Sequence, residues 1–297
     1  MDIKKIICTT DFSDPAREAL PHAVELARKF GAHITVLHVR TLFTDDPSNV
    51  EFQFLDEDMY EEFLDKNLEK AAKPISSDVE FETAVVRNVS PAAGILEYAD
   101  EEAADLVVMG THGRSALGHF FLGSVAEKVV RHAPCAVLTV GPEGQDHYIH
   151  KPDHAEILAP FDFSEHSIEA VGRALELARA FDANVHVLYV LEQEVHPAFF
   201  ATWKLSVEQH LDEIRRNAVK ALQEELGSET LEKIKVTVKI GDDRSDREIS
   251  RYCRENDIDL VVMGTHGLSG IDRALLGSTT ERVVRKAPCP VLTLKLR

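Results

Sequence analysis

The sequence DLVVMGTHG occurs twice, at Asp105–Gly113 and at Asp259–Gly267, and a Gly-Ser pair follows each copy after nine further residues. The complete pattern is Gly-x2-Gly-x9-Gly-Ser, formed by Gly110, Gly113, Gly123 and Ser124 in the first copy and by Gly264, Gly267, Gly277 and Ser278 in the second. One stretch thus indicates both a tandem duplication and a glycine-rich loop leading into a helix. Such a loop can hold phosphate groups at the helix N-terminus.

Further segments match between the two halves of the chain. Asp11-Phe12-Ser13 corresponds to Asp162-Phe163-Ser164, and Glu127–Cys135 corresponds to Glu281–Cys289. A length of 297 residues favours two domains. We predict them at residues 1–141 and 154–297, joined by a polar linker at residues 142–153 that contains proline and glycine.

Short β-rich runs alternate with helical patterns in both halves. The strands expected in the first half are Lys4–Thr9, His33–Arg40, Glu80–Arg87, Asp105–Gly110 and Ala136–Val140, and those in the second half are Ala155–Pro160, Asn184–Leu191, Lys233–Ile240, Leu260–Gly264 and Val291–Lys295. The helices expected in the first half are Pro15–Phe30, Glu57–Lys73, Pro91–Ala104 and Val125–Ala133. Because runs such as IKKIICTT and LVVMG are too apolar for a half-exposed antiparallel strand, they suit a parallel sheet covered on both faces. The predicted fold is α/β, with two Rossmann-like, doubly wound domains of five parallel strands each.

The composition restricts the partners and the compartment. A net charge of −18 argues against nucleic acid or an anionic membrane as the main partner. We find no uncharged apolar run of 18 residues, so a membrane span is not expected. The four cysteines form no CxxC pair, which favours a reducing, cytoplasmic setting.

The repeated loop also places a ligand. In open α/β sheets, ligands bind beyond the carboxyl ends of the strands, where the strand order reverses. Gly110 and Gly113 would let the backbone approach a ligand closely, and the helix that begins near Gly123 would attract an anion. A phosphate chain held there would direct its nucleoside toward Asp11, whose carboxylate can accept a hydrogen bond from a ribose hydroxyl or a base amino group.

Each of these residues also has a purely structural interpretation. Ser124-x-x-Glu127 and Ser278-x-x-Glu281 match the capping box of a helix N-terminus. Asp11 and Asp162 can serve a turn before a helix, Met109 and Met263 can fill the sheet, and His112 and His266 can be loop hydrogen-bonding groups rather than acid–base catalysts. His147, His150 and His154 in the linker are a weaker pattern for a metal site.

Four segments taken in order, DFS, VVMGTHG, the Gly-x2-Gly-x9-Gly-Ser pattern and AEKVVRHAPC, resemble the universal stress protein family in its tandem form. The resemblance covers nearly the whole chain. Members with the complete glycine pattern are the nucleotide-binding ones, so the resemblance implies one ATP site per domain, with Mg²⁺ bridging the phosphates. The first site would be formed by Asp11, Val39, Met109, Gly110, His112, Gly113, Gly123, Ser124 and Val125, and the second by Asp162, Val190, Met263, Gly264, His266, Gly267, Gly277, Ser278 and Thr279.

The copies differ in places. Pro160 matches the family where the first copy has Thr9, and Gly241 matches a family glycine where the alignment gives Arg87. Arg114 has Leu268 as its counterpart. Equal affinity at the two sites is therefore not expected.

The leading hypothesis is a stress-response ATP-binding module whose output is a conformational or assembly state, acting on a regulatory partner that the sequence does not name. The enzyme alternative is a slow ATPase or nucleotide-processing protein on the same scaffold. We find no Walker A, HIGH or G-x-S-x-G motif, so dedicated catalysis is not expected. In a third hypothesis, one of the two domains is a scaffold that only completes the intramolecular pseudo-dimer. The family's pairing implies a pseudo-dimer through Ala136–Val140 and Val291–Lys295, and the whole chain can form a further homodimer.

Overall fold

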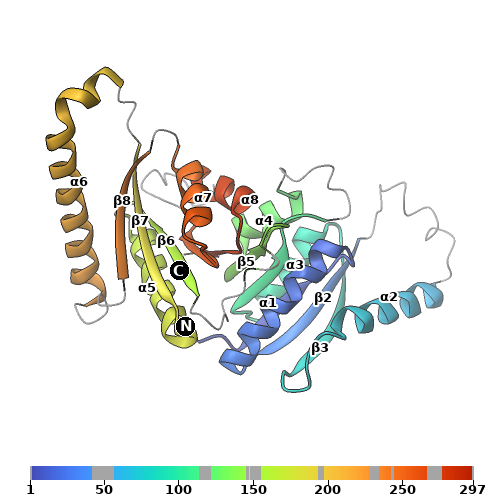
Figure 1. Cartoon of the computed structure of the whole chain (residues 1–297). Coiled ribbons are helices and arrows are strands. Elements are labelled where there is room, and N and C mark those ends of the chain that lie inside the picture. The colour runs from blue at the N-terminus through green and yellow to red at the C-terminus, as the bar shows by residue number, and fades with distance from the viewer. Residues whose placement is uncertain are drawn as a thin grey trace. The chain divides into compact units, whose positions relative to one another are not determined.

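In the computed structural model, strands and helices alternate along both halves of the chain (Figure 1). The structure describes residues 2–41, 57–113, 122–144, 147, 155–192, 197–227, 234–241, 244–265 and 276–295. The internal contacts divide the chain into two compact units, Asp2–Pro142 and Glu143–Arg297. The packing predicted between the last strands of the two units stays a prediction.

The first unit is a five-stranded parallel sheet with the order β3-β2-β1-β4-β5. Its elements are β1 (Lys5–Thr9), α1 (Asp14–Phe30), β2 (His33–Thr41), α2 (Glu57–Ala72), β3 (Phe81–Asn88), α3 (Pro91–Glu101), β4 (Leu106–Gly110), α4 (Ser124–His132) and β5 (Ala136–Val140). The doubly wound fold is therefore confirmed. Helix α3 ends three residues before the predicted Ala104, because Ala103 has a left-handed backbone with φ of 48°.

The second unit repeats this topology in the order β10-β9-β6-β7-β8. Its elements are β6 (Glu156–Phe161), α5 (Glu165–Phe181), β7 (Asn184–Glu192), α6 (Pro197–Leu226), β8 (Ile234–Gly241), α7 (Ser245–Glu255), β9 (Leu260–Gly264), α8 (Ser278–Lys286) and β10 (Val291–Leu294). None of the helices found within the described residues has the length and apolar character needed to cross a membrane.

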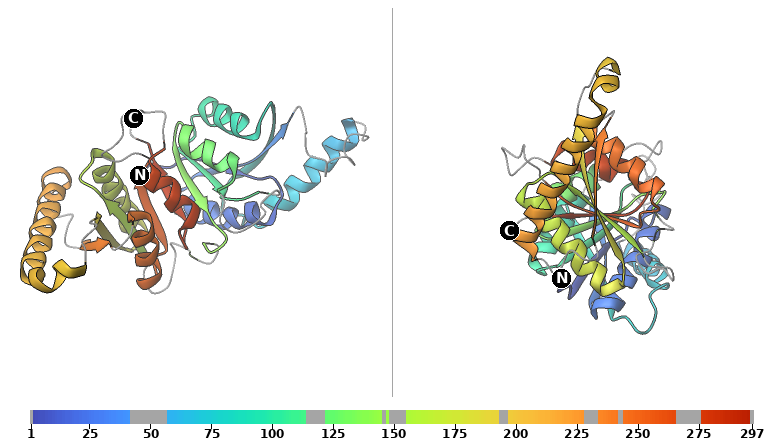
Figure 2. Two further views of the ribbon diagram at one scale, coloured as in Figure 1. Left: turned by 90° about the horizontal axis from the view of Figure 1, so that it is seen from above. Right: turned by 60° about the vertical axis from the view of Figure 1, so that its left-hand side comes forward.

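Helices cover both faces of each sheet (Figure 2). Helix α3 packs beside α4, and α7 packs beside α8, whereas α1 and α5 lie against the central strands of their units. Strands β1 and β4 are buried almost throughout, as expected for inner parallel strands covered on both sides. The chain leaves β1 for β2 on one side and later returns to β4 on the other side, so the order reverses between β1 and β4.

The strand register corrects one pairing of the two copies. Glu192 at the end of β7 lies opposite Gly241, whereas Thr41 at the end of β2 lies opposite Asn88. Gly241 is thus the structural counterpart of Asn88, and the alignment with Arg87 was wrong by one residue. The reason is that the two copies are offset by 153 residues at β3 and β8 and by 154 residues only from α3 and α7 onward, so one extra residue of the second copy lies after β8.

Candidate functional site

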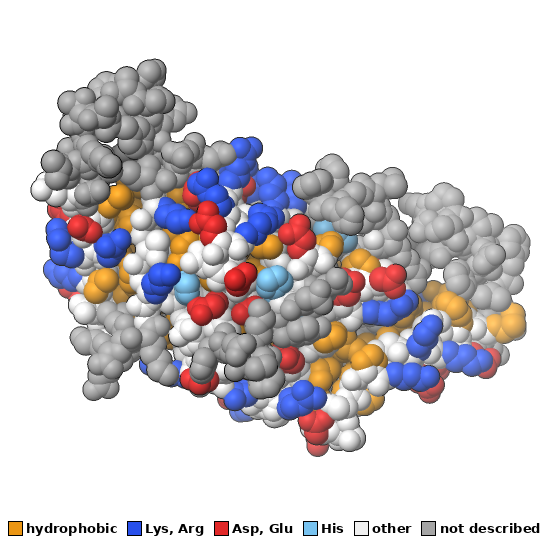
Figure 3. All heavy atoms as spheres, in the orientation of Figure 1, with side chains coloured by type: hydrophobic (Ala, Val, Ile, Leu, Met, Phe, Trp, Pro, Cys, Tyr) orange, Lys and Arg blue, Asp and Glu red, His pale blue; other side chains and the backbone are white. Residues whose placement is uncertain are grey.

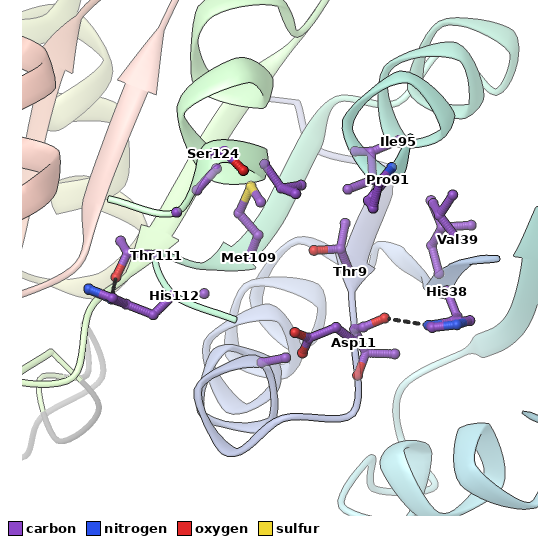
Figure 4. A pocket seen from close by; sticks show the side chains of 17 residues that line it. Thr9, Asp11, His38, Val39, Pro91, Ile95, Met109, Thr111, His112 and Ser124 are labelled. Carbon is purple, nitrogen blue, oxygen red and sulfur yellow. Dashed lines mark hydrogen bonds between the residues drawn. The ribbon is translucent and has the colours of Figure 1, made fainter. Parts of the chain in front are cut away.

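An open cavity of about 190 Å³ lies beyond the carboxyl ends of β1, β2 and β4 in the first unit. It is lined by most of the residues predicted for the first site, namely Asp11, Val39, Met109, Gly110, His112, Gly123, Ser124 and Val125. Figure 4 shows Ser124 at one end and Val39 at the other, with Met109 and Thr9 between them. Strands β2 and β4, whose carboxyl ends border the cavity, are two strand spacings or roughly 9.5 Å apart.

The N-terminus of α4 opens into this cavity without a side-chain cap. Gly123 is the N-cap residue, with φ of −61° and ψ of 142°, and Ser124 is already the first helical residue. The predicted capping box was therefore wrong, because its serine must occupy the N-cap position. Glu127 does not reach back to the helix start either; it accepts a hydrogen bond from Arg131 at 2.8 Å. The first N–H groups of α4 are thus left available to an anion.

At Gly110 and at Gly123, a side chain would come too close to a different part of the backbone. A Cβ on Gly110 would lie 2.8 Å from the carbonyl oxygen of Pro15, so this glycine allows α1 to approach β4. A Cβ on Gly123 would lie 3.0 Å from the carbonyl oxygen of Thr111. Gly110 also lines the cavity, so the idea that it keeps the backbone clear for a ligand stays a prediction beside this packing role.

Asp11 is held in a fixed position by the loop after β1. Its Oδ1 accepts a hydrogen bond from the Ser13 N–H at 3.0 Å, and Ser13 caps α1. The turn interpretation of Asp11 is therefore confirmed. A Cβ on Gly113 would lie 2.7 Å from the Asp11 Oδ2. Gly113 therefore makes room for this carboxylate, although Gly113 is not among the residues that line the cavity.

The residue after this aspartate carries backbone strain. Phe12 has φ of 65°, a left-handed conformation that an aromatic residue rarely adopts. The Phe12 ring stacks on His38 at 4.4 Å, and the His38 Nδ1 lies 2.8 Å from the carbonyl oxygen of Thr10. Such strain persists only where surrounding contacts fix the conformation, and it is common at binding sites.

The buried His112 ring lies beside the cavity, with its Nδ1 2.8 Å from the Thr111 hydroxyl (Figure 4). This contact agrees with the interpretation of His112 as a loop hydrogen-bonding residue. Met109 is buried and also lines the cavity, so its two interpretations hold together.

Comparison with known proteins accounts for this arrangement. A sequence model of the universal stress protein family matches residues 2–141 and again residues 155–295. The chain belongs to the universal stress protein family. A universal stress protein of Methanocaldococcus jannaschii is 37% identical over 141 residues, which is 46% of this chain and 81% of the relative. One from Synechocystis is 25% identical over 99% of this chain and 100% of its own length.

A solved structure supports the fold of the whole chain. The crystal structure of a universal stress protein from Archaeoglobus fulgidus superposes with a TM-score of 0.70 and covers 99% of both chains, at 19% identity. Together with the double family match, this likeness identifies the molecule as two universal stress protein domains with the Rossmann-like architecture.

The second universal stress protein domain has a larger cavity, about 420 Å³, at the equivalent place. It is lined by Asp162, Val190, Met263, Gly264, Gly277, Ser278 and Thr279. His266 and Gly267 lie outside the described residues. Gly277 is the N-cap residue of α8, again without a side-chain cap, so the capping box was wrong here too. Phe163 has the same φ of 65° as Phe12, and its ring contacts Tyr189.

One wall of each cavity was missed by the sequence analysis. In the first domain it is formed by Pro91 and Ile95 of α3, and in the second by Ser245 and Ile249 of α7. Glu192 also lines the second cavity. A signal was available: Ser90-Pro91 starts a helix directly after the third strand, and the carboxyl ends of parallel strands share one edge of the sheet.

Of the three linker histidines, His147 is the one that lies within the described residues. His147 Nδ1 lies 3.5 Å from Asp259 Oδ1, while His150 and His154 lie outside the described residues. Within the part of the chain that the structure describes, no three His, Cys, Asp or Glu side chains are grouped as metal ligands.

Proposed function

We propose that each universal stress protein domain binds one adenine nucleotide, ATP, and that the chain is a stress-response module whose conformation or assembly depends on that nucleotide. The observation that carries the proposal is the pair of uncapped helix ends. Both α4 and α8 begin at a glycine without a side-chain cap, and both open into a cavity at the switch point of their sheet. A helix end of this kind favours phosphate.

The opposite end of each cavity suits a nucleoside. In the first domain Val39, Pro91 and Ile95 provide apolar surface for a flat base, and the backbone at Val39 offers polar groups to its edge. Asp11 lies between this end and the phosphate end (Figure 4) and can accept a hydrogen bond from a ribose hydroxyl. The polar groups are few and the remaining walls apolar, as in most small-molecule sites.

A divalent ion would have to come with the phosphates. Mg²⁺ usually keeps several waters and is bound through one or two carboxylates together with substrate phosphates. The described residues of the first cavity offer Asp11 as their carboxylate, which is consistent with this mode and not with a protein cage. When bound, the ion would offset phosphate charge in a protein of net charge −18. On the face shown in Figure 3, acidic and basic side chains are interspersed over the described residues.

The enzyme alternative is a slow ATPase. It would use His112 to orient a water, but the Thr111 hydroxyl beside Nδ1 gives that ring a structural role instead. We therefore propose that turnover is below about one per second, the low end of ordinary enzymes. All four cysteines are buried and none forms a disulfide, which agrees with a reducing compartment such as the cytoplasm as part of this proposal.

The test is direct. Protein purified without added nucleotide is denatured and its released small molecules are identified by mass spectrometry, and ATP binding to the emptied protein is measured by calorimetry. We expect two sites per chain. The variants Ser124→Glu and Ser278→Glu should each remove one of them, because a carboxylate in the first helical turn repels phosphate while it stabilises the helix. Absence of both released nucleotide and ATP binding contradicts the proposal, and rapid turnover would favour the enzyme.

A further inference from the structure

The two cavities share one end and differ at the other. Both have a glycine, a serine at the helix start and an aspartate in a strained loop. Among the described residues, one group of differences lies over β2 and β7 and over the first turns of α3 and α7, where the base of a nucleotide would sit.

Glu192 is the main difference at that end. It is the last residue of β7, two positions beyond Val190, and it lines the second cavity. Its Oε1 accepts a hydrogen bond from the Ser245 N–H at 2.7 Å, which fixes the carboxylate against the start of α7. The residue opposite Glu192 in the sheet is Gly241, which presents no side chain beside it.

The first domain has neither the carboxylate of Glu192 nor the N–H group of Ser245 at the equivalent positions. Thr41 replaces Glu192, and Thr41 is not among the described residues that line the first cavity. Pro91 replaces Ser245, and proline has no N–H with which to anchor a carboxylate. The sheet neighbour of Thr41 is Asn88, whose side-chain amide donates to Glu97 at 2.7 Å.

Glu192 is a carboxylate at neutral pH. The hydrogen bonds from Ser245 lower the pKa of the Glu192 carboxyl from its usual value, more than its limited burial raises it. An ionised carboxylate only accepts hydrogen bonds, and two oxygens give it more acceptor sites than Ser245 uses. It therefore favours a ligand edge that carries donors and disfavours one that carries an acceptor.

We propose that Glu192 accepts a hydrogen bond from the 6-amino group of the purine in the second site, making this site selective for 6-amino over 6-oxo purine nucleotides. The inference rests on the proposed function. The first site has no charged acceptor at this position and discriminates less between the two purines. A hydrogen bond to a charged group contributes enough to change a ratio of affinities by about 10- to 100-fold.

The experiment compares ATP with inosine triphosphate, which carries an oxygen in place of the 6-amino group. Calorimetry on the Ser124→Glu chain reports the second site alone, and the Ser278→Glu chain reports the first. We expect ATP to bind the second site at least about tenfold more tightly than inosine triphosphate, with a much smaller ratio at the first site.

Glu192→Gln in the Ser124→Glu chain separates base recognition from helix capping. The glutamine carbonyl can still accept from the Ser245 N–H, while its amide can donate to a 6-oxo group. The ratio of the affinity for ATP to the affinity for inosine triphosphate should therefore fall toward one, while the thermal stability of the chain is unchanged. Glu192→Thr, the residue of the first domain, should lower the ratio as well.

An unchanged ratio in Glu192→Gln overturns the inference and leaves the proposed function intact, because Glu192 would then serve only α7. Tighter binding of GTP than of ATP at the second site also overturns it, since the carboxylate would then read the N1 and N2 donors of guanine. If no nucleotide binds to either variant chain, the proposed function fails and the inference fails with it.

Discussion

Glu25→Gln should stabilise the first domain above pH 7 and leave its stability unchanged near pH 4. Glu25 is half-buried on α1, and its Oε2 is shielded from solvent without a hydrogen-bond partner. Burial raises the pKa of the Glu25 carboxyl from 4.5 to about 7, against the opposing attraction of Arg28. The folded domain thus holds a proton that the unfolded chain has already lost.

The sign and size follow from proton linkage. Below pH 4.5 the carboxyl is protonated in both states and has no effect on the free energy of unfolding. Between pH 4.5 and about 7 the folded state binds more protons than the unfolded state, so stability falls as the pH rises. Above pH 7 the loss is complete. A pKa raised by this amount corresponds to at most about 3 kcal/mol, and partial exposure of Glu25 reduces it to roughly 1–3 kcal/mol.

The measurement is urea unfolding at pH 4, 6 and 8, combined with hydrogen exchange of α1 and β1. Exchange is needed because a chain of two domains does not have to unfold in one step. The matched control is Glu176→Gln at the equivalent position of α5, where the carboxylate accepts a hydrogen bond from Arg173 at 2.9 Å. That change should not stabilise its domain. An equal effect of Glu25→Gln at pH 4 and pH 8 would refute the reasoning.

Three further predictions concern the stability of the two domains. Gly110→Ala should destabilise the first domain by about 1–3 kcal/mol in urea unfolding, because the new Cβ would lie 2.8 Å from the Pro15 carbonyl oxygen. Phe12→Gly should give a domain more stable than Phe12→Ala by about 1 kcal/mol, reversing the usual order, because only glycine adopts a φ of 65° without strain. Burial lowers the pKa of His186 more than its contact with a neighbouring glutamate raises it, so the second domain should lose stability as the pH falls through 6.5. His186→Gln should remove that acidic loss in thermal unfolding.

The fold was predictable because parallel strands covered on both faces are apolar throughout. Lys5–Thr9 and Leu106–Gly110 have this composition, and Ala136–Val140 was placed at its observed limits. The pairing of the third strands was not predictable from alignment. Strand β3 alternates between exposed and partly exposed residues, so its residue types do not favour one register over a register shifted by one.

Most residues of the candidate site could be predicted from the sequence, but the structural role of each residue was harder to predict. The glycine pattern located the helix start, but it did not show whether Gly123 or Ser124 is the N-cap, since both residue types are common there. The close approach of Pro15 to Gly110 depends on the packing of α1 on the sheet, which no local pattern encodes. Glu192 was missed because its role requires the start of α7 beside it, more than fifty residues later in the chain.

There is a physical reason why the two cavities are alike at one end and differ at the other. At the proposed phosphate end the groups offered to a ligand are backbone N–H groups, and exchanging side chains such as Val125 for Thr279 leaves those groups in place. At the base end the walls are side chains, so single substitutions there, such as Pro91 against Ser245, change which hydrogen bonds exist. A duplicated domain can therefore alter the base it selects without losing its hold on phosphate. Within the described residues, we therefore expect differences in base selection between the two domains to arise beside β2 and β7.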